Sequence, residues 1–181
     1  MAVPPTSSKV ELRRELRAAR RKFAEERVFS PNETALARLR AVIATSLCVA
    51  GYWPVLGEPD VRALISAARS KALPRIDANG VMRFHLWHDG DDTEMQYRFE
   101  QPRAAAPLAQ PDVVLTPLVG FDRSLSRLGQ GGGHYDRWFF AYPGAIKIGI
   151  AWSVQEVDSL PVAPHDIRLD AILTEKEWIT R

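Results

Sequence analysis

Residues 121–137 read F-D-R-S-L-S-R-L-G-Q-G-G-G-H-Y-D-R, and the rest of the chain is best understood outward from this stretch. Four of the eleven glycines of the chain fall within residues 129–133. The apolar run of residues 113–119 precedes the stretch, and a predicted helix, residues 135–142, follows it. A strand, a glycine-rich loop and a helix start together predict an anion site. Glycines let backbone N–H groups approach a phosphate, and the helix N-terminus adds favourable partial charge.

Charged side chains flank these glycines on both sides. Arg123, Arg127 and Arg137 supply guanidinium groups that can clamp phosphate oxygens through paired hydrogen bonds. Asp122 and Asp136 are hard oxygen ligands suited to Mg²⁺. The alternative is a glycine-rich surface turn, but the flanking charges favour phosphate binding. The loop is not a Walker A motif, because no Gly-Lys-Ser/Thr follows, and it does not match G-x-G-x-x-G.

The segment R-L-G-Q-G-G-G-H-Y-D-R, with F-D ahead of it, resembles the signature of the 5-formyltetrahydrofolate cyclo-ligase family. That signature runs R-L-G-x-G-x-G-x-Y-D-R and is far more specific than a lone glycine pattern. The resemblance extends from Lys9 to Asp170 and is thin between residues 80 and 110. It implies an ATP-dependent ring closure of 5-formyltetrahydrofolate to 5,10-methenyltetrahydrofolate. The formyl oxygen attacks the γ-phosphate, the second bridging nitrogen attacks the activated carbon, and phosphate leaves.

The resemblance also implies roles for individual residues. Arg127 is expected to neutralise the transferring phosphate, and Tyr135 to shape the catalytic pocket. Asp136 and Asp166 are expected to hold Mg²⁺, although spacing alone would not have paired them. The loop residues expected to bind ATP are Arg127, Leu128, Gly129, Gln130, Gly131, Gly132, Gly133, His134 and Tyr135.

Two positions of the loop depart from the family pattern. Ser126 stands where the family often has glycine, so the turn there is expected to differ in backbone angle. His134 stands where an aromatic residue is common, which puts a stacking role in doubt. An imidazole near phosphates predicts activity that is sensitive to pH at about pH 6–7.

The N-terminal part predicts a capped basic helix. Residues 1–7 hold two prolines and small polar residues and are expected to be disordered. Ser8 and Glu11 form a capping box for a helix over residues 9–28. Its apolar side chains recur at steps of three and four residues: Leu12, Leu16, Ala19 and Phe23.

The basic face of this helix has two interpretations. From the residues alone a solvated face is favoured over an anion-binding role for Lys9 and Arg13. The family resemblance reverses this for Lys9 and Arg13, because its first helix has the pattern K-x-x-L-R, whose lysine and arginine contact ATP. The later basic residues stay assigned to solvent, among them Arg14, Arg17, Arg20, Arg21 and Lys22.

Glu58 and Trp53 are the candidate folate contacts. A second capping box at residues 30–33, with Pro31 as the first helical residue, predicts a helix over residues 32–46. A buried strand over residues 47–53 and a helix from residue 59 or 60 to residue 70 follow. Glu58 before that helix is either a helix-dipole carboxylate or a ligand group. In the resembled family this glutamate binds the pterin. A carboxylate suits an aminopyrimidine edge because it accepts paired hydrogen bonds. Trp53 lies against folate by the same resemblance, or belongs to the core.

The remaining apolar runs predict further strands over residues 72–76, 81–88, 145–152 and 171–174. His85 and His88 fall on opposite faces of one strand, which argues against a joint metal site. Residues 93–111 are expected to be irregular and to fold over the site. The expected fold is a single three-layer α/β domain over residues 8–181, with a central, mostly parallel sheet flanked by helices. Ligands should enter at the carboxyl ends of its strands.

Composition restricts the partners. The 181 residues carry a net charge of +2 and are 46% hydrophobic, which suits one globular domain and does not demand nucleic acid. The lone Cys48 excludes a disulfide within the chain and fits a reducing cytoplasm. No apolar run approaches the ~18 residues of a membrane span. We expect a cytoplasmic monomer, and the family resemblance implies 5-formyltetrahydrofolate and ATP as its partners.

Two other functions remain open at this point. One is a non-catalytic protein that binds RNA or a phosphorylated ligand, which the basic first helix would suit. The acidic residues Glu58, Asp136 and Asp166 argue against a cleft for a polyanion. The other is a kinase or ligase that acts on a different small metabolite.

Overall fold

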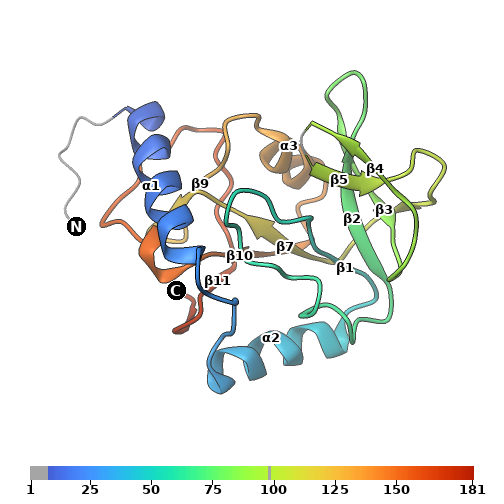
Figure 1. The fold of residues 1–181 in the computed structure, drawn as a ribbon, viewed down its shortest axis with the longest axis horizontal. Helices are drawn as coiled ribbons and strands as arrows, with labels where there is room; N and C mark the ends of the chain where they lie inside the picture. Colours follow the sequence, from blue (N-terminus) through green and yellow to red (C-terminus); the bar gives the residue numbers. More distant parts are fainter. Residues whose placement is uncertain (1–7, 98) are drawn as a thin grey trace.

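The apolar runs form the centre of one eight-stranded sheet in a computed structural model of the chain (Figure 1). The structure describes residues 8–97 and 99–181, so the expectation that residues 1–7 are disordered lies outside the described residues. In spatial order the strands are β12 (Trp178–Ile179), β11 (Ala171–Leu173), β10 (Ile146–Ile150), β7 (Val113–Pro117), β1 (Val49–Ala50), β2 (Lys71–Ile76), β3 (Met82–Leu86) and β6 (Leu108–Ala109).

The five central strands are parallel, and antiparallel strands extend the sheet on both sides. Strands β11, β10, β7, β1 and β2 pair in parallel. Strand β12 runs antiparallel to β11, and β3 runs antiparallel to both β2 and β6. Strands of a parallel core are buried on both faces, which is why their sequences read as apolar runs. The predicted α/β fold with a mostly parallel sheet is confirmed.

Helices α2 (Glu33–Thr45) and α3 (His134–Ala141) cover opposite faces of the sheet (Figure 1). Val113 and Leu115 of β7 belong to the same apolar cluster as Leu39 of α2. Val114, between them, packs in a second cluster with Trp138 of α3. Because successive side chains of a strand point to opposite faces, the sheet is the middle of three layers.

Helix α1 (Lys9–Ala24) packs at the end of the sheet. Its predicted capping box is present: Glu11 N donates to Ser8 Oγ at 3.3 Å, and Ser8 N donates to Glu11 Oε2 at 3.0 Å. Leu12 and Leu16 pack in one cluster with Leu128. Leu128 lies in the small hairpin of β8 (Gly120–Phe121) and β9 (Arg127–Leu128), and the helix also contacts the 3₁₀ turn η1 (Ser153–Gln155).

The predicted cap of α2 was wrong by two residues. Asn32 is the N-cap, and its side-chain oxygen accepts a hydrogen bond from Ala35 N at 2.8 Å. Asn32 also donates its side-chain amide to Lys176 O and its backbone N–H to Glu175 O. Asn32 therefore caps the helix and ties it to the segment before β12, whereas Ser30 is exposed.

The predicted helix between residues 59 and 70 is also wrong, because the structure has a series of turns there. Most of its backbone hydrogen bonds span three residues, as from Leu64 N to Val61 O at 2.9 Å. Asp60 accepts a hydrogen bond from Arg62 N at 3.0 Å, which competes with a regular helix start. Val61 and Ile65 are fully buried, so burial of these side chains defines the segment.

Residues 93–111 are not irregular as predicted, because they contain a hairpin. Strand β4 (Thr93–Gln96) pairs antiparallel with β5 (Phe99–Pro102), and β6 joins the main sheet. Met95, Tyr97 and Phe99 alternate in the sequence, which is the spacing of a strand. This alternation predicts one continuous strand and not a hairpin, whereas Tyr97 lies in the turn between β4 and β5 with φ +52°.

Within the part of the chain that the structure describes, no helix is long and apolar enough to cross a membrane. Cys48 is half-buried beside the cluster that contains Trp138. Burial, together with the charge of Asp112, raises the pKa of Cys48 to about 11. The thiol is therefore protonated at neutral pH, in line with a structural role.

The cap of α2 gives a stability prediction. Asn32→Ala should lower the free energy of unfolding by about 1–2 kcal/mol, because it removes the cap and the ties to residues 175 and 176. Ser30→Ala, at the position predicted from the sequence, should change it by less than about 0.5 kcal/mol. Urea denaturation followed by circular dichroism measures both. Equal effects of the two substitutions would contradict the structural assignment of the cap.

Candidate functional site

A cavity of about 1030 Å³ opens at the carboxyl ends of β1, β2 and β7. Tyr52 and Glu58 follow β1, Ile76 ends β2, and Pro117 ends β7. From β1 the chain first adds β2 on one side and later β7 on the other. The cavity therefore lies at a topological switch point, where open α/β sheets bind their ligands.

The structure brings to this one cavity every residue for which the family resemblance implied a role. Their individual roles stay predictions. They are Lys9, Arg13, Trp53, Glu58, Arg127, Leu128, Gly129, Gln130, Gly131, Gly132, Gly133, His134, Tyr135, Asp136 and Asp166.

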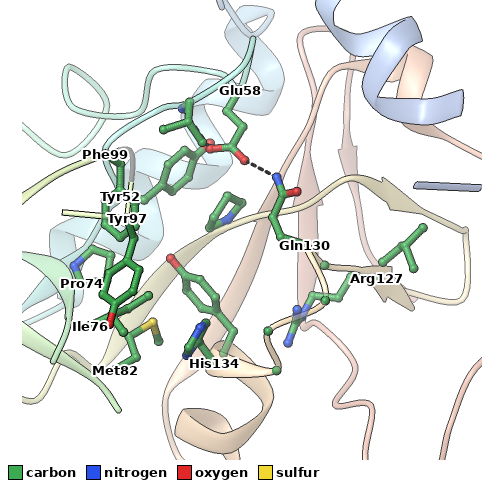
Figure 2. A pocket seen from close by; sticks show the side chains of 18 of the residues that line it. Tyr52, Glu58, Pro74, Ile76, Met82, Tyr97, Phe99, Arg127, Gln130 and His134 are labelled. Atoms are coloured by element: carbon green, nitrogen blue, oxygen red, sulfur yellow. Dashed lines mark hydrogen bonds between the residues drawn. The ribbon is translucent and has the colours of Figure 1, made fainter. Parts of the chain in front are cut away.

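The cavity has an apolar side, and part of it comes from residues 93–111, which were expected to fold over the site. Figure 2 shows this side opposite Arg127 and Gln130, with Glu58 at the boundary. Its side chains come from β2, from β3 and from the β4–β5 hairpin: Pro74, Ile76, Met82, Met95, Tyr97 and Phe99. The region that the family resemblance covered least therefore supplies much of this surface.

The glycine-rich loop presents unpaired donors to the cavity. Within the described residues, the N–H groups of Gly131, Gly132 and Gly133 donate no hydrogen bond. Gly131 has φ +108° and Gly133 has φ +65°, a backbone region that glycine adopts readily. Helix α3 begins directly after Gly133, so the positive partial charge of its N-terminus lies at this loop. The arrangement is that of an anion-binding loop.

Helix α1 holds this loop through its arginines. Arg13 Nε donates to Gly129 O at 2.8 Å. Arg17 donates to the side-chain and backbone oxygens of Gln130 at 2.9 and 3.2 Å. The prediction that the later basic residues of the helix face only solvent is therefore wrong for Arg17.

The prediction is also wrong for Arg20, whose side chain is fully buried. Arg20 Nη1 donates to Glu58 Oε1 at 3.3 Å and to Leu118 O at 3.2 Å. The sequence held a signal for this, because Arg20 continues the four-residue stripe of Leu12 and Leu16. An arginine at a core position predicts a buried acidic partner.

Glu58 is a buried carboxylate at the edge of the cavity. Burial raises its pKa, and the nearby Arg20 charge and the hydrogen bonds to the carboxylate oppose this rise. Glu58 Oε2 accepts a hydrogen bond from Val55 N at 3.2 Å, and Oε1 accepts one from Gln130 Nε2 at 3.0 Å (Figure 2). Glu58 is not a helix-dipole carboxylate, because no regular helix follows it, and its role as a ligand group stays a prediction.

Asp136 and Asp166 each accept hydrogen bonds on one carboxylate oxygen. Asp136 Oδ1 accepts from Arg127 Nη2 at 2.7 Å. Asp166 Oδ2 accepts from Lys9 Nζ at 2.6 Å and from Ala163 N at 2.7 Å. Burial alone would raise the pKa of Asp166, but these two hydrogen bonds lower it. No hydrogen bond from the described residues reaches Asp136 Oδ2 or Asp166 Oδ1.

These two carboxylates suit Mg²⁺ that arrives with phosphate. Among the described residues, no group of three or more His, Cys, Asp or Glu side chains could hold a metal alone. Mg²⁺ is commonly held by one or two carboxylates together with substrate phosphates and water. The donor set at Asp136 and Asp166 therefore fits this ion only as part of a ternary site with a phosphorylated ligand.

Three charged residues near the loop do not border the cavity. Asp122 is buried and accepts hydrogen bonds from Ser124 N at 2.9 Å and from Leu160 N at 2.9 Å, so it stabilises the turn after β8. Arg123 pairs with Glu156 on the surface at 2.6 Å. Arg137, the third, contacts His134. The structure therefore does not bring these three residues to the cavity, and it gives Asp122, Arg123 and Arg137 partners within the protein.

Two aromatic candidates differ in their surroundings. Burial raises the pKa of Tyr135, so its hydroxyl stays protonated and can donate a hydrogen bond at neutral pH. Trp53 is half-buried, with the Arg62 guanidinium 4.3 Å from its ring centroid and Trp87 packed edge-on. Trp53 therefore borders the cavity while its position is fixed by protein contacts.

His134 is held in a neutral form. Its Nδ1 lies 3.1 Å from Arg137 Nη2, and a guanidinium has only donors, so Nδ1 must be the acceptor. Burial lowers the pKa of His134 below its ordinary 6.5, the Arg137 charge lowers it further, and a hydrogen bond with the Gly80 backbone opposes both. In the ligand-free chain, the titration expected at about pH 6–7 therefore moves to lower pH.

The fold and the cavity define the class of protein, which is an α/β protein with an anion-binding loop at the switch point of its sheet. The profile of the 5-formyltetrahydrofolate cyclo-ligase family matches residues 5–175. The chain belongs to this family of enzymes.

The chain has relatives over nearly its full length. It is 31% identical over 179 residues to the 5-formyltetrahydrofolate cyclo-ligase of Escherichia coli (strain K12), covering 90% of this chain and 98% of the relative. It is 29% identical over 186 residues to that of Mycolicibacterium smegmatis, covering 95% and 96%. The NMR structure of Aquifex aeolicus 5,10-methenyltetrahydrofolate synthetase matches with a TM-score of 0.79 at 27% identity, covering 95% of this chain and 92% of that chain.

The state of His134 is testable by NMR titration. We expect its pKa to lie below 6.5 in the ligand-free chain. Arg137→Ala should raise this pKa, because it removes both the repulsive charge and the donor to Nδ1. Arg38→Ala, which removes an arginine from α2, serves as the control and should leave it unchanged. A pKa that does not respond to Arg137→Ala would show that the contact does not hold the neutral form.

Proposed function

We propose that this chain closes the ring of 5-formyltetrahydrofolate to 5,10-methenyltetrahydrofolate, with conversion of ATP to ADP and phosphate and with Mg²⁺. Residues 8–181 act as one catalytic domain. The observation that carries the proposal is the composition of the cavity. One space joins a buried carboxylate and an apolar surface to a glycine-rich loop and several cations. A folate and a nucleoside triphosphate need these two kinds of surface, in contact with each other.

Glu58 and the apolar side receive the pterin. The aminopyrimidine edge of a pterin presents adjacent N–H donors, and an ionised carboxylate accepts such a pair strongly. The charge of Arg20 favours the ionised form of Glu58 and opposes the rise of its pKa that burial causes. Side chains such as Ile76, Met82 and Phe99 then cover the flat faces of the rings and exclude water from them.

The loop, Lys9, Arg13 and Arg127 receive the triphosphate. The N–H groups of Gly131, Gly132 and Gly133 offer donors without rearrangement of a paired backbone. Phosphoryl transfer needs mainly positioning and neutralisation of charge on the phosphate oxygens. When bound, Mg²⁺ would neutralise phosphate oxygens, and Asp136 and Asp166 are the residues that would hold it.

The chemistry has two steps. The formyl oxygen attacks the γ-phosphorus of ATP. The bond between this phosphorus and the oxygen shared with the β-phosphate breaks, and ADP leaves. The second bridging nitrogen then attacks the activated carbon, loses its proton, and phosphate leaves with the former formyl oxygen. We assign Arg127 to the first step, because its side chain borders the cavity and is only 5% exposed. Its Nε is buried and makes no hydrogen bond within the described residues.

Absorbance of the purified chain with 5-formyltetrahydrofolate, ATP and Mg²⁺ tests the proposed reaction. We expect the absorbance of the methenyl product to increase only when all three are present, with one ADP formed for each methenyl product. Consumption of ATP with a different metabolite, and none with this folate, would overturn the substrate. Growth of the chromophore without ATP would overturn the phosphorylation step.

Arg127 gives the sharpest mutational test. Arg127→Ala should lower kcat by about 10²–10³-fold at saturating ATP, because it removes a buried charge donor from the transferring phosphate. Arg127→Lys should recover only part of this loss, since lysine lacks the planar fork. Arg123→Ala, in the same segment but away from the cavity, should stay within about twofold of wild type. Full turnover by Arg127→Ala would exclude this role.

A further inference from the structure

The carboxylate of Glu58 is nearly saturated with donors before any substrate binds. A carboxylate has about four positions for accepted hydrogen bonds, two on each oxygen. On Oε1 both are used, by Arg20 Nη1 at 3.3 Å and by Gln130 Nε2 at 3.0 Å. On Oε2 one is used, by Val55 N at 3.2 Å. A ligand that presents one donor to each oxygen must therefore replace a donor on Oε1.

The two donors on Oε1 differ in how firmly they are held. The side chain of Arg20 is 0% exposed and also donates to Leu56 O and Leu118 O, so it cannot leave without loss of packed contacts. Gln130 is exposed and lies in the glycine-rich loop. Apart from Glu58, its side chain contacts Arg17, which can follow the loop because the pair lies at the surface. Gln130 is the donor that a ligand can displace.

Gln130 also connects the two halves of the cavity. Its side chain reaches Glu58 at the pterin side, and its backbone stands between Gly129 and Gly131 in the phosphate loop (Figure 2). The family signature leaves this position open, so the connection comes from the residue that this chain carries. A movement of Gln130 away from Glu58 would release one of the tethers of the loop.

We propose that Gln130 is an exchangeable ligand of Glu58. Its carboxamide holds the carboxylate in the ligand-free chain and gives way to the N–H edge of the bound pterin, which couples folate binding to the loop that takes the triphosphate. The inference rests on the proposed function, because it takes the pterin as the ligand of Glu58. Coupling between two sites is reciprocal, so a nucleotide that draws the loop away from Glu58 strengthens folate binding by the same factor.

Binding measurements with Gln130→Met test the proposal, because methionine keeps the length of the side chain and removes its donor. Calorimetry gives the Kd of 5-formyltetrahydrofolate with and without a non-hydrolysable ATP analogue and Mg²⁺. In the wild-type chain the analogue should lower this Kd by about fivefold or more. In Gln130→Met the factor should fall below about twofold, and the Kd without nucleotide should be lower than in wild type, since no donor has to be displaced.

A second variant and a control keep the result interpretable. Gln130→Ala should behave like Gln130→Met, and Gln110→Met, the same chemical change at an exposed site, should behave like wild type. An unchanged coupling factor, or weaker folate binding without nucleotide in both Gln130 variants, would overturn the exchange. Failure of the wild-type chain to form the methenyl product would instead overturn the proposed function.

Discussion

The buried ion pair between Arg20 and Glu58 is the contact on which the geometry of the cavity depends. Both side chains are almost completely removed from solvent, and Arg20 also donates to Leu56 O and Leu118 O. One arginine of α1 is thereby fixed to the segments that leave β1 and β7, on the two sides of the switch point. Removal of one partner from a buried pair typically costs about 3–5 kcal/mol, because the other charge is left uncompensated.

Helix α1 contacts the cavity through basic side chains along one face. Four basic residues at steps of three or four positions contact, one after another, the parts of the cavity. In chain order, Lys9, Arg13, Arg17 and Arg20 reach Asp166, Gly129, Gln130 and Glu58. A single rigid helix therefore sets the distance between the glycine-rich loop and the buried carboxylate. An in-line transfer between two bound substrates requires such a fixed separation.

The sequence predicted the parallel core and the glycine-rich loop because both have local signatures, an apolar run and a dense glycine motif. It failed where long-range contacts decide the structure. The segment that contains Val61 and Ile65 forms turns that bury both side chains in the core, although their spacing fits a helix. Arg123 has the same local context as Arg127, but only the fold pairs it with Glu156 at the surface. The burial of Arg20 could be predicted because it continues the apolar stripe of Leu12 and Leu16. Its partner Glu58 could not be predicted, because the two residues lie far apart in the chain.

In the proposed function, one cavity binds both substrates, with Glu58 and the glycine-rich loop as its two ends. A crystal structure of the chain with 5-formyltetrahydrofolate and a non-hydrolysable ATP analogue tests it most directly. We predict that the pterin N–H edge lies within hydrogen-bond distance of Glu58 and that the phosphates lie against the N–H groups of Gly131, Gly132 and Gly133. A pterin bound away from Glu58, or phosphates bound away from the loop, would contradict the claim.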